Sequence, residues 1–189
     1  DGDFVLTNKT YFSYYLIKYF EKNNTLLPNN IIEQGLSKSL DKGNSDQITT
    51  IFKAKALVSN NIIEILDEID GIKWVKSNEH RVEYHKENYS EKENAQTNLK
   101  IKAKIIDTLI SCKKTKELLK LSKELKTDKK LLNKVLFALV KLFLPYEKKT
   151  GVNYIQQLDF NLLSDKTYFK VISFCSDYLN KDEVLELFP

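Results

Sequence analysis

The chain has 189 residues, of which 42% are hydrophobic and 30% are charged, a balance that supports a packed core and argues against intrinsic disorder. With only 5 glycines and 3 prolines, β-sandwiches, barrels and glycine-rich phosphate loops are disfavoured. The 2 histidines and 2 cysteines nearly exclude zinc-finger and disulfide frameworks, and no apolar run is long enough to span a bilayer. The chain begins at Asp1-Gly2 without a methionine, so we expect a piece of a larger protein.

Charge is distributed unevenly along the chain. Residues 1–90 have a net charge of −2, whereas residues 91–189 have a net charge of +6. Arg81 is the only arginine in the sequence, so lysine supplies nearly all of the positive charge. This asymmetry predicts two modules with different partners.

The first region predicts four helices and a hairpin. Thr7 or Asn8 can cap the first helix, which carries a stripe of aromatic residues with helical spacing. Gly71 is suited to the C-terminal cap of the fourth helix. After Gly71 the pattern changes to the alternation that is typical of strands. The predicted elements are helices at about 8–22, 30–41, 46–58 and 62–70, and strands at 72–76 and 81–85.

A polar segment, residues 86–98, lacks hydrophobic periodicity and separates two apolar-patterned regions. We therefore predict a linker at about residues 89–95, with one module at residues 1–88 and a second at residues 96–189.

The second region repeats the order of the first. The residues placed to cap helices are Thr115, either Thr127 or Asp128, Ser164 and Asn180. Pro145 ends the longest helix, and Lys149-Thr150-Gly151 is predicted to be the turn of a second hairpin. The predicted elements are helices at about 97–112, 116–125 and 128–144, a hairpin at 146–155, and helices at 164–179 and 181–188.

Helix, short helix, short break, helix and hairpin is the order of a winged helix-turn-helix. Because this order occurs twice, we predict a mainly α protein with small β-hairpins, built as a tandem winged helix-turn-helix.

The sequence holds no constellation typical of catalysis or metal binding. His80 and His85 lie on opposite sides of a predicted turn rather than on one helical face. Cys112 and Cys175 are interpreted as buried, reduced thiols, which fits a cytosolic or nuclear compartment. Walker-type and dinucleotide motifs are missing from the sequence. We therefore predict a non-enzymatic protein with no metal and no cofactor.

The predicted recognition helix of the first module is acidic, and it contains no lysine or arginine. Its four carboxylates would face DNA phosphates spaced at one charge per roughly 1.7 Å of duplex, so docking on DNA is disfavoured. We predict instead a protein-binding surface made of Glu64, Asp67, Glu68, Trp74, Arg81 and Tyr84. For Trp74, a place in the module core is the alternative.

The second module carries a candidate nucleic-acid interface. Its lysines are Lys129, Lys130 and Lys134 on the predicted recognition helix and Lys148 and Lys149 on the predicted wing. The alternative interpretation is a solvated, lysine-rich surface. Because bidentate contact with guanine is chiefly an arginine function, any DNA contact is expected to be weak, nonspecific and salt-sensitive.

The chain resembles the C-terminal tandem winged-helix domain of the Stn subunit of the yeast CST telomere-capping complex. The resemblance rests on the order of the predicted elements, the polar linker, the predicted wing that carries Trp74, and the length of the chain. The resemblance implies a non-enzymatic adaptor in the nucleus, at telomeric chromatin, preceded by an oligonucleotide-binding fold. It implies two partners, the single-strand telomere-binding subunit of the CST complex and the regulatory subunit of DNA polymerase α–primase. The first module is also similar to the winged helix of the middle subunit of replication protein A, which recruits proteins. No site residue carries over by motif.

Two other functions stay open at this point. A replication initiator or transcription-machinery subunit would bind DNA through the basic second module. A membrane-trafficking adaptor built from paired winged helices would be distinguished by its cellular location.

Overall fold

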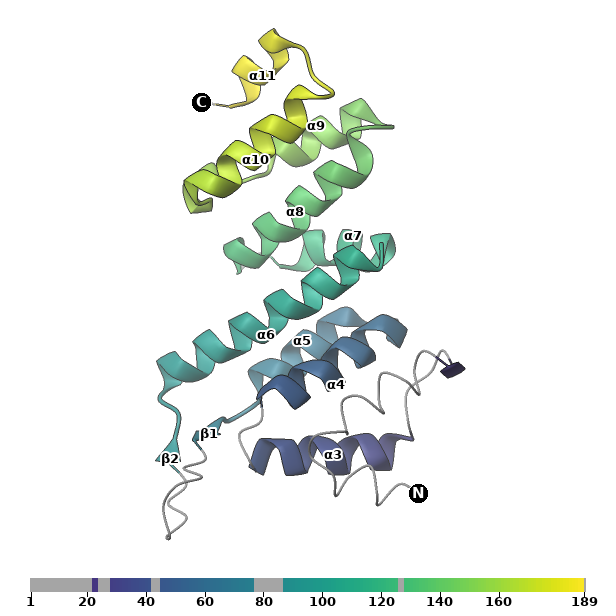
Figure 1. The fold of residues 1–189 in the computed structure, drawn as a ribbon, viewed down its shortest axis with the longest axis vertical. Coiled ribbons are helices and arrows are strands. Elements are labelled where there is room, and N and C mark those ends of the chain that lie inside the picture. The colour runs from purple at the N-terminus through teal and green to yellow at the C-terminus, as the bar shows by residue number, and fades with distance from the viewer. Residues whose placement is uncertain (1–21, 24–27, 42–44, 77–86, 126–127, 189) are drawn as a thin grey trace. The chain divides into compact units, whose positions relative to one another are not determined.

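The structure, a computed structural model, describes residues 22–23, 28–41, 45–76, 87–125 and 128–188. Helices dominate the described chain, which confirms the mainly α prediction (Figure 1). The chain divides into two units, Asp1–Leu109 and Ile110–Pro189. The division therefore falls between Leu109 and Ile110 and not at the linker predicted near residues 89–95.

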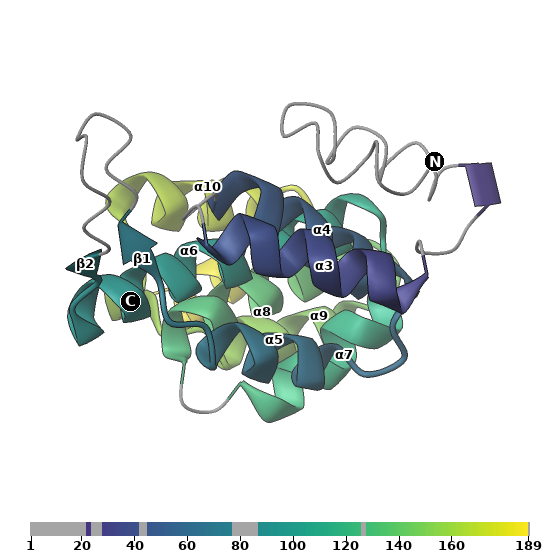
Figure 2. The same cartoon turned by 90° about the horizontal axis from the view of Figure 1, so that it is seen from below.

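Three helices of the first unit lie close to their predicted bounds: α3 (Asn29–Asp41), α4 (Ser45–Val58) and α5 (Ile62–Asp70). Helices α3 and α4 lie side by side (Figure 2), and the hydroxyl of Ser39 donates to Gln47 Oε1 at 3.0 Å between them. Helix α5 buries four apolar side chains with helical spacing: Ile62, Ile65, Leu66 and Ile69. Its opposite face is left to solvent.

A short antiparallel pair of strands follows α5. Strand β1 (Val75–Lys76) pairs with β2 (Glu87–Asn88), with Val75 opposite Asn88. Strand β1 falls within the first predicted strand, but its partner comes after the range predicted for the second. The predicted strand at 81–85, with Arg81 and Tyr84, lies outside the described residues, as does the predicted helix up to residue 21.

Helix α6 (Glu91–Ser111) occupies most of the segment that was predicted to be a linker. It begins with a capping box, because the N–H of Ser90 donates to Glu93 Oε2 at 2.9 Å and the N–H of Glu93 donates to Ser90 Oγ at 3.3 Å. The linker prediction is wrong because polar Asn94 and Asn98 take inward positions of this helix, where hydrophobic residues were expected.

These two asparagines hold Trp74, which is only 2% exposed. The indole N–H of Trp74 donates to Asn98 Oδ1 at 2.6 Å, and its backbone N–H donates to Asn94 Oδ1 at 2.9 Å. Asn94 also donates to the carbonyl of Tyr89, whose N–H donates to the carbonyl of Trp74. The prediction that Trp74 belongs to an exposed partner-binding surface is therefore wrong, and the alternative place in the core is correct.

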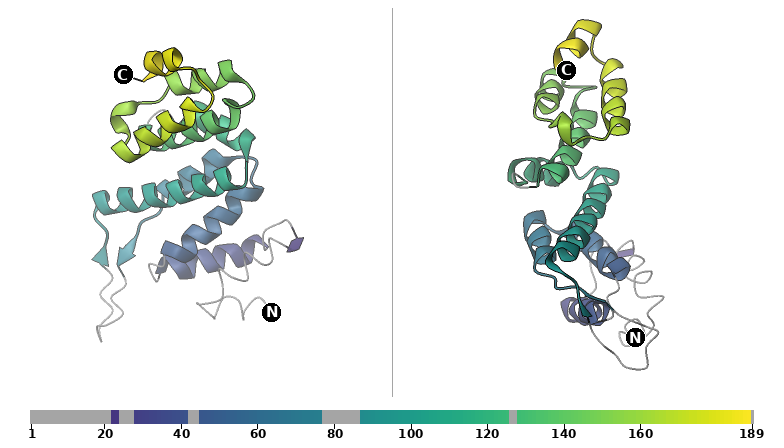
Figure 3. Two further views of the ribbon diagram at one scale, coloured as in Figure 1. Left: turned by 45° about the horizontal axis from the view of Figure 1, so that its top comes forward. Right: turned by 90° about the vertical axis from the view of Figure 1, so that its left-hand side faces the viewer.

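In the described part of the second unit, all of the regular elements are helices, which turns and short loops connect (Figure 3). Ser164 and Asn180 cap α10 and α11 through their side chains, as predicted, and Asp128, one of two predicted alternatives, caps α8. The prediction that Thr115 caps a helix is wrong, because Thr115 is the first residue of α7 and Lys114 occupies the cap position. The elements are α7 (Thr115–Glu124), α8 (Lys129–Phe143), α9 (Lys148–Gln156), the 3-10 turn η1 (Phe160–Leu162), α10 (Asp165–Ser176) and α11 (Lys181–Leu187).

Helix α9 stands where the second hairpin was predicted, so the prediction of a second wing at 146–155 is wrong. Gly151, interpreted as a turn residue, is buried inside this helix. A Cβ atom on Gly151 would lie 2.5 Å from the Cα of Leu144, so glycine is required for the close approach of α9 to the end of α8. The second unit therefore lacks a winged-helix hairpin in its described residues.

Helix α9 runs back along α8, and a buried asparagine fixes the far end of this pair. Asn133 on α8 donates from Nδ2 to the carbonyl of Asp159 at 2.7 Å and accepts the N–H of Asp159 at 2.9 Å. The backbone N–H and the carbonyl of Asp159, in the loop after α9, are therefore both hydrogen-bonded inside the protein. The neighbouring core combines Leu136 and Val140 of α8 with Ile155, Val171 and Cys175.

We expect Asn98→Ala to destabilise the first unit by about 1–3 kcal/mol, because it leaves the buried indole N–H of Trp74 without an acceptor. Urea denaturation followed by circular dichroism measures this change. Gln96→Ala, at an exposed position of the same helix, is the matched control and should change stability by less than about 0.5 kcal/mol. Equal effects of the two substitutions would contradict the role given to Asn98.

We expect Gly151→Ala to lower the stability of the second unit by about 1–3 kcal/mol, because the added methyl group meets the backbone of Leu144. Gly71→Ala is the control, and it should change stability little. Its Cβ would make an ordinary van der Waals contact, 3.4 Å from the carbonyl oxygen of Glu68, and its φ of −72° suits any residue. Thermal unfolding of both variants tests the contrast, and a neutral Gly151→Ala would argue against close packing of α8 and α9.

Candidate functional site

The exposed side of α5 forms an acidic face, which we define as Glu64, Asp67, Glu68 and Asp70. All four side chains are exposed, as the sequence predicts, whereas the apolar residues of the same helix are buried. Two turns of helix backed by the core therefore present four carboxylates in a fixed arrangement.

Two lysines pair with this acidic face from other helices. Lys55 of α4 places Nζ 2.9 Å from Glu68 Oε1 and 3.5 Å from Oε1 of Glu33 on α3. Lys102 of α6 pairs with Asp70. Exposed pairs of this kind contribute only about 0–1 kcal/mol each, so they orient the carboxylates more than they stabilise the unit.

Glu64 and Asp67 make no ion pair with any residue in the described ranges. The unpaired negative charge of α5 is therefore concentrated on these two residues. Sequence reasoning found the carboxylates but missed Lys55 and Lys102, because each lysine is distant in sequence from its partner on α5.

The predicted basic interface of the second unit is divided between two places. Lys129 and Lys130 stand at the start of α8, with Lys134 one turn further along the same helix. Lys148 and Lys149 begin α9, which follows the other end of α8. The 15 residues of α8 rise about 20 Å, so these two lysine groups lie at opposite ends of that helix.

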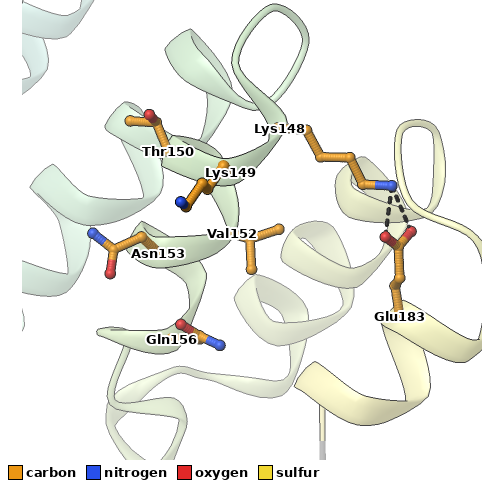
Figure 4. Close-up of a pocket in the computed structure, with 7 residues that line it drawn as sticks. All are labelled: Lys148, Lys149, Thr150, Val152, Asn153, Gln156 and Glu183. Atoms are coloured by element: carbon orange, nitrogen blue, oxygen red, sulfur yellow. Dashed lines mark hydrogen bonds and ion pairs between the residues drawn. The ribbon is translucent and has the colours of Figure 1, made fainter.

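An open groove of about 720 Å³ lies between α9 and α11 (Figure 4). Its lining residues from α9 include Lys148, Lys149, Val152, Asn153 and Gln156, and α11 contributes Glu183. Lys148 Nζ lies 2.6 Å from Oε1 and 2.8 Å from Oε2 of Glu183.

Glu183 has two functions in this groove. Besides binding Lys148, its Oε2 accepts the N–H of Asn180 at 2.8 Å and so completes the capping box of α11. The hydrogen bond from Lys148, together with that from the Asn180 backbone, lowers the pKa of Glu183 below its ordinary value. Glu183 is therefore a carboxylate held in ionised form against a lysine.

The two cysteines differ in environment. Cys175 is buried in the core of the second unit, and burial raises the pKa of its thiol to about 11. Cys112 follows the last residue of α6 and is exposed, so the prediction that it is buried is wrong. Its position after the end of the helix explains the difference.

The described part of the chain contains no group of three or more His, Cys, Asp or Glu side chains placed to hold a metal ion. His80 and His85 lie outside the described residues. None of the helices described is both long and apolar enough to cross a membrane.

Comparisons with protein-family models, with curated proteins and with solved structures find no match to this chain.

We expect a maleimide reagent to modify one cysteine of the native protein at neutral pH and two after denaturation. Cys112 is accessible, whereas Cys175 is both buried and almost wholly protonated. Intact-mass spectrometry of the wild type and of Cys112→Ser distinguishes the two thiols. Rapid native labelling of Cys112→Ser would contradict the burial of Cys175.

Proposed function

We propose that the chain is a non-enzymatic protein-interaction module, and that its first unit binds a basic surface of a partner protein through the acidic face of α5. The observation that carries this proposal is the pair of exposed, unpaired carboxylates of Glu64 and Asp67 on a helix whose other side is buried. A rigid charged helix face can recognise complementary charge without first ordering itself.

The finer fold proposal is that the first unit is a winged helix. Its support is the succession of α4, the break at residues 59–61, α5 and the β1–β2 pair. In that arrangement α5 takes the place of the recognition helix. Because this helix carries only acidic charged residues, phosphate repulsion disfavours DNA and leaves a basic protein surface as the complementary partner.

A narrower form of the proposal follows from the resemblance to the Stn subunit of the CST complex. It makes the chain a nuclear adaptor at telomeric chromatin, with the single-strand telomere-binding subunit and the regulatory subunit of DNA polymerase α–primase as partners. The acidic α5 of the first unit supports an adaptor role, whereas the helical α9 of the second unit departs from the tandem winged-helix pattern.

The DNA-binding alternative is not carried further. It required a recognition helix and a wing that together form one basic face, but the predicted wing is helix α9, and the lysines of α8 predicted for the interface lie in its first half, away from Lys148 and Lys149. Lys148 is moreover bound to Glu183, which reduces the positive charge available to a phosphate.

We expect the double variant Glu64→Lys/Asp67→Lys to weaken partner binding at least about tenfold, because a basic partner then meets like charge. The measurement is a quantitative pull-down with the full chain as bait and the two purified telomere proteins as prey. The control Glu124→Lys/Glu186→Lys makes the same change of net charge at exposed positions of the second unit and should bind normally.

Retention that is equal for the wild type and the α5 variant would overturn the role of the acidic face. If neither telomere protein binds, the narrower proposal fails. The broader one is then tested by comparing which cellular proteins the wild type and the α5 variant retain, and identical sets would contradict it.

A further inference from the structure

The groove between α9 and α11 already holds one carboxylate, which is that of Glu183. Both of its oxygens contact Lys148 Nζ, at 2.6 and 2.8 Å. None of the residues of α11 is fully buried, but Val184 and Leu187 pack against the core of the second unit, and the ring centroid of Phe188 lies 5.2 Å from that of Phe160. Helix α11 thus forms one wall of the groove, and Lys148 already binds a carboxylate there.

The remainder of the groove offers polar groups that are not engaged. Within the described ranges, the ammonium group of Lys149 and the side-chain amides of Asn153 and Gln156 make no hydrogen bond or ion pair. Lys149, Asn153 and Gln156 are all exposed, and they line the groove along α9 (Figure 4). Val152, half-buried against the core of the second unit, also lines the groove, on the side that faces Glu183 (Figure 4).

This set of groups matches a peptide. A side-chain amide can donate to a backbone carbonyl and accept from a backbone N–H, so Asn153 and Gln156 suit a polypeptide main chain. Lys149 suits a carboxylate, and Val152 suits an apolar side chain.

A nucleic acid matches these groups less well. The lining has two lysines, and Glu183 neutralises one of them, whereas a polyanion requires several free cations along its path. Lys129 and Lys130 lie at the other end of α8, so they add no cation next to the groove. Neither Tyr146 nor Tyr154, the two tyrosines nearest in sequence, lines the groove.

We infer that the α9–α11 groove binds an acidic peptide segment of a partner protein, with a carboxylate on Lys149 and the peptide main chain on the amides of Asn153 and Gln156. This surface lies on the second unit, so the inference does not rest on the function proposed for α5.

The test measures fluorescence anisotropy of a fluorescein-labelled peptide of alternating glutamate and leucine with the full chain. Saturable binding is expected below about 1 mM. Lys149→Glu should weaken this binding at least about tenfold through like-charge repulsion. A glutamate in the first turn of α9 is favourable to the helix, so the loss would not come from unfolding, which circular dichroism checks.

Two further variants sharpen the test. Lys166→Glu, at an exposed position of α10 outside the groove, makes the same charge change and should bind the peptide normally. Glu183→Gln should strengthen binding about threefold, because it removes a competing carboxylate while keeping an acceptor for the α11 cap. Weaker or unchanged binding by Glu183→Gln would contradict a shared site.

Other results would overturn the inference. These are the absence of saturable peptide binding, equal losses for Lys149→Glu and Lys166→Glu, or tighter binding of a labelled oligothymidine of about fifteen nucleotides that Lys149→Glu abolishes. The last result would assign the groove to nucleic acid.

Discussion

Burial of the Trp74 indole against α6 is the constraint on which the first unit depends. An indole removes about 200 Å² from water, worth roughly 5 kcal/mol, but only if its N–H finds a partner inside the protein. Asn98 supplies that partner, and Asn94 satisfies the backbone of the same residue. The chain between α5 and β1 is thereby fixed against α6, and the pairing of Lys102 with Asp70 joins α5 to the same helix.

Local signals in the sequence were sufficient to predict most helices, because the helices are amphipathic and several of them begin at a side-chain cap. Helix α8 begins after Asp128, one of its two predicted caps, and ends one residue before its predicted limit. The two main errors concern residues with more than one structural use. Gly151 was predicted to be a turn residue, but it is a glycine because α9 packs closely against Leu144 and leaves no room for a side chain. This contact is visible only in the tertiary structure. Asn94 was predicted to lie in the linker, although the Ser90–Glu93 capping box was present in the sequence as a helix signal.

In the candidate sites, too, features of a single helix could be predicted from the sequence, whereas contacts between helices could not. The carboxylates of α5 could be predicted because a single helix presents them all. Their pairing with Lys55 and Lys102 could not, since no local pattern joins residues of three different helices. The lysines of the second unit were identified individually, but their grouping depended on a hairpin that is instead α9. A charge pattern therefore predicts which residues are exposed more reliably than it predicts which residues form one surface.

The place of Trp74 has a practical consequence for following the two units separately. It is the one tryptophan of the 189 residues, and it lies in the interior of the first unit. Tryptophan emission therefore reports the opening of that unit and is blind to the second. A wavelength shift that precedes the loss of helical signal would show that the two halves of the chain melt as independent cooperative bodies.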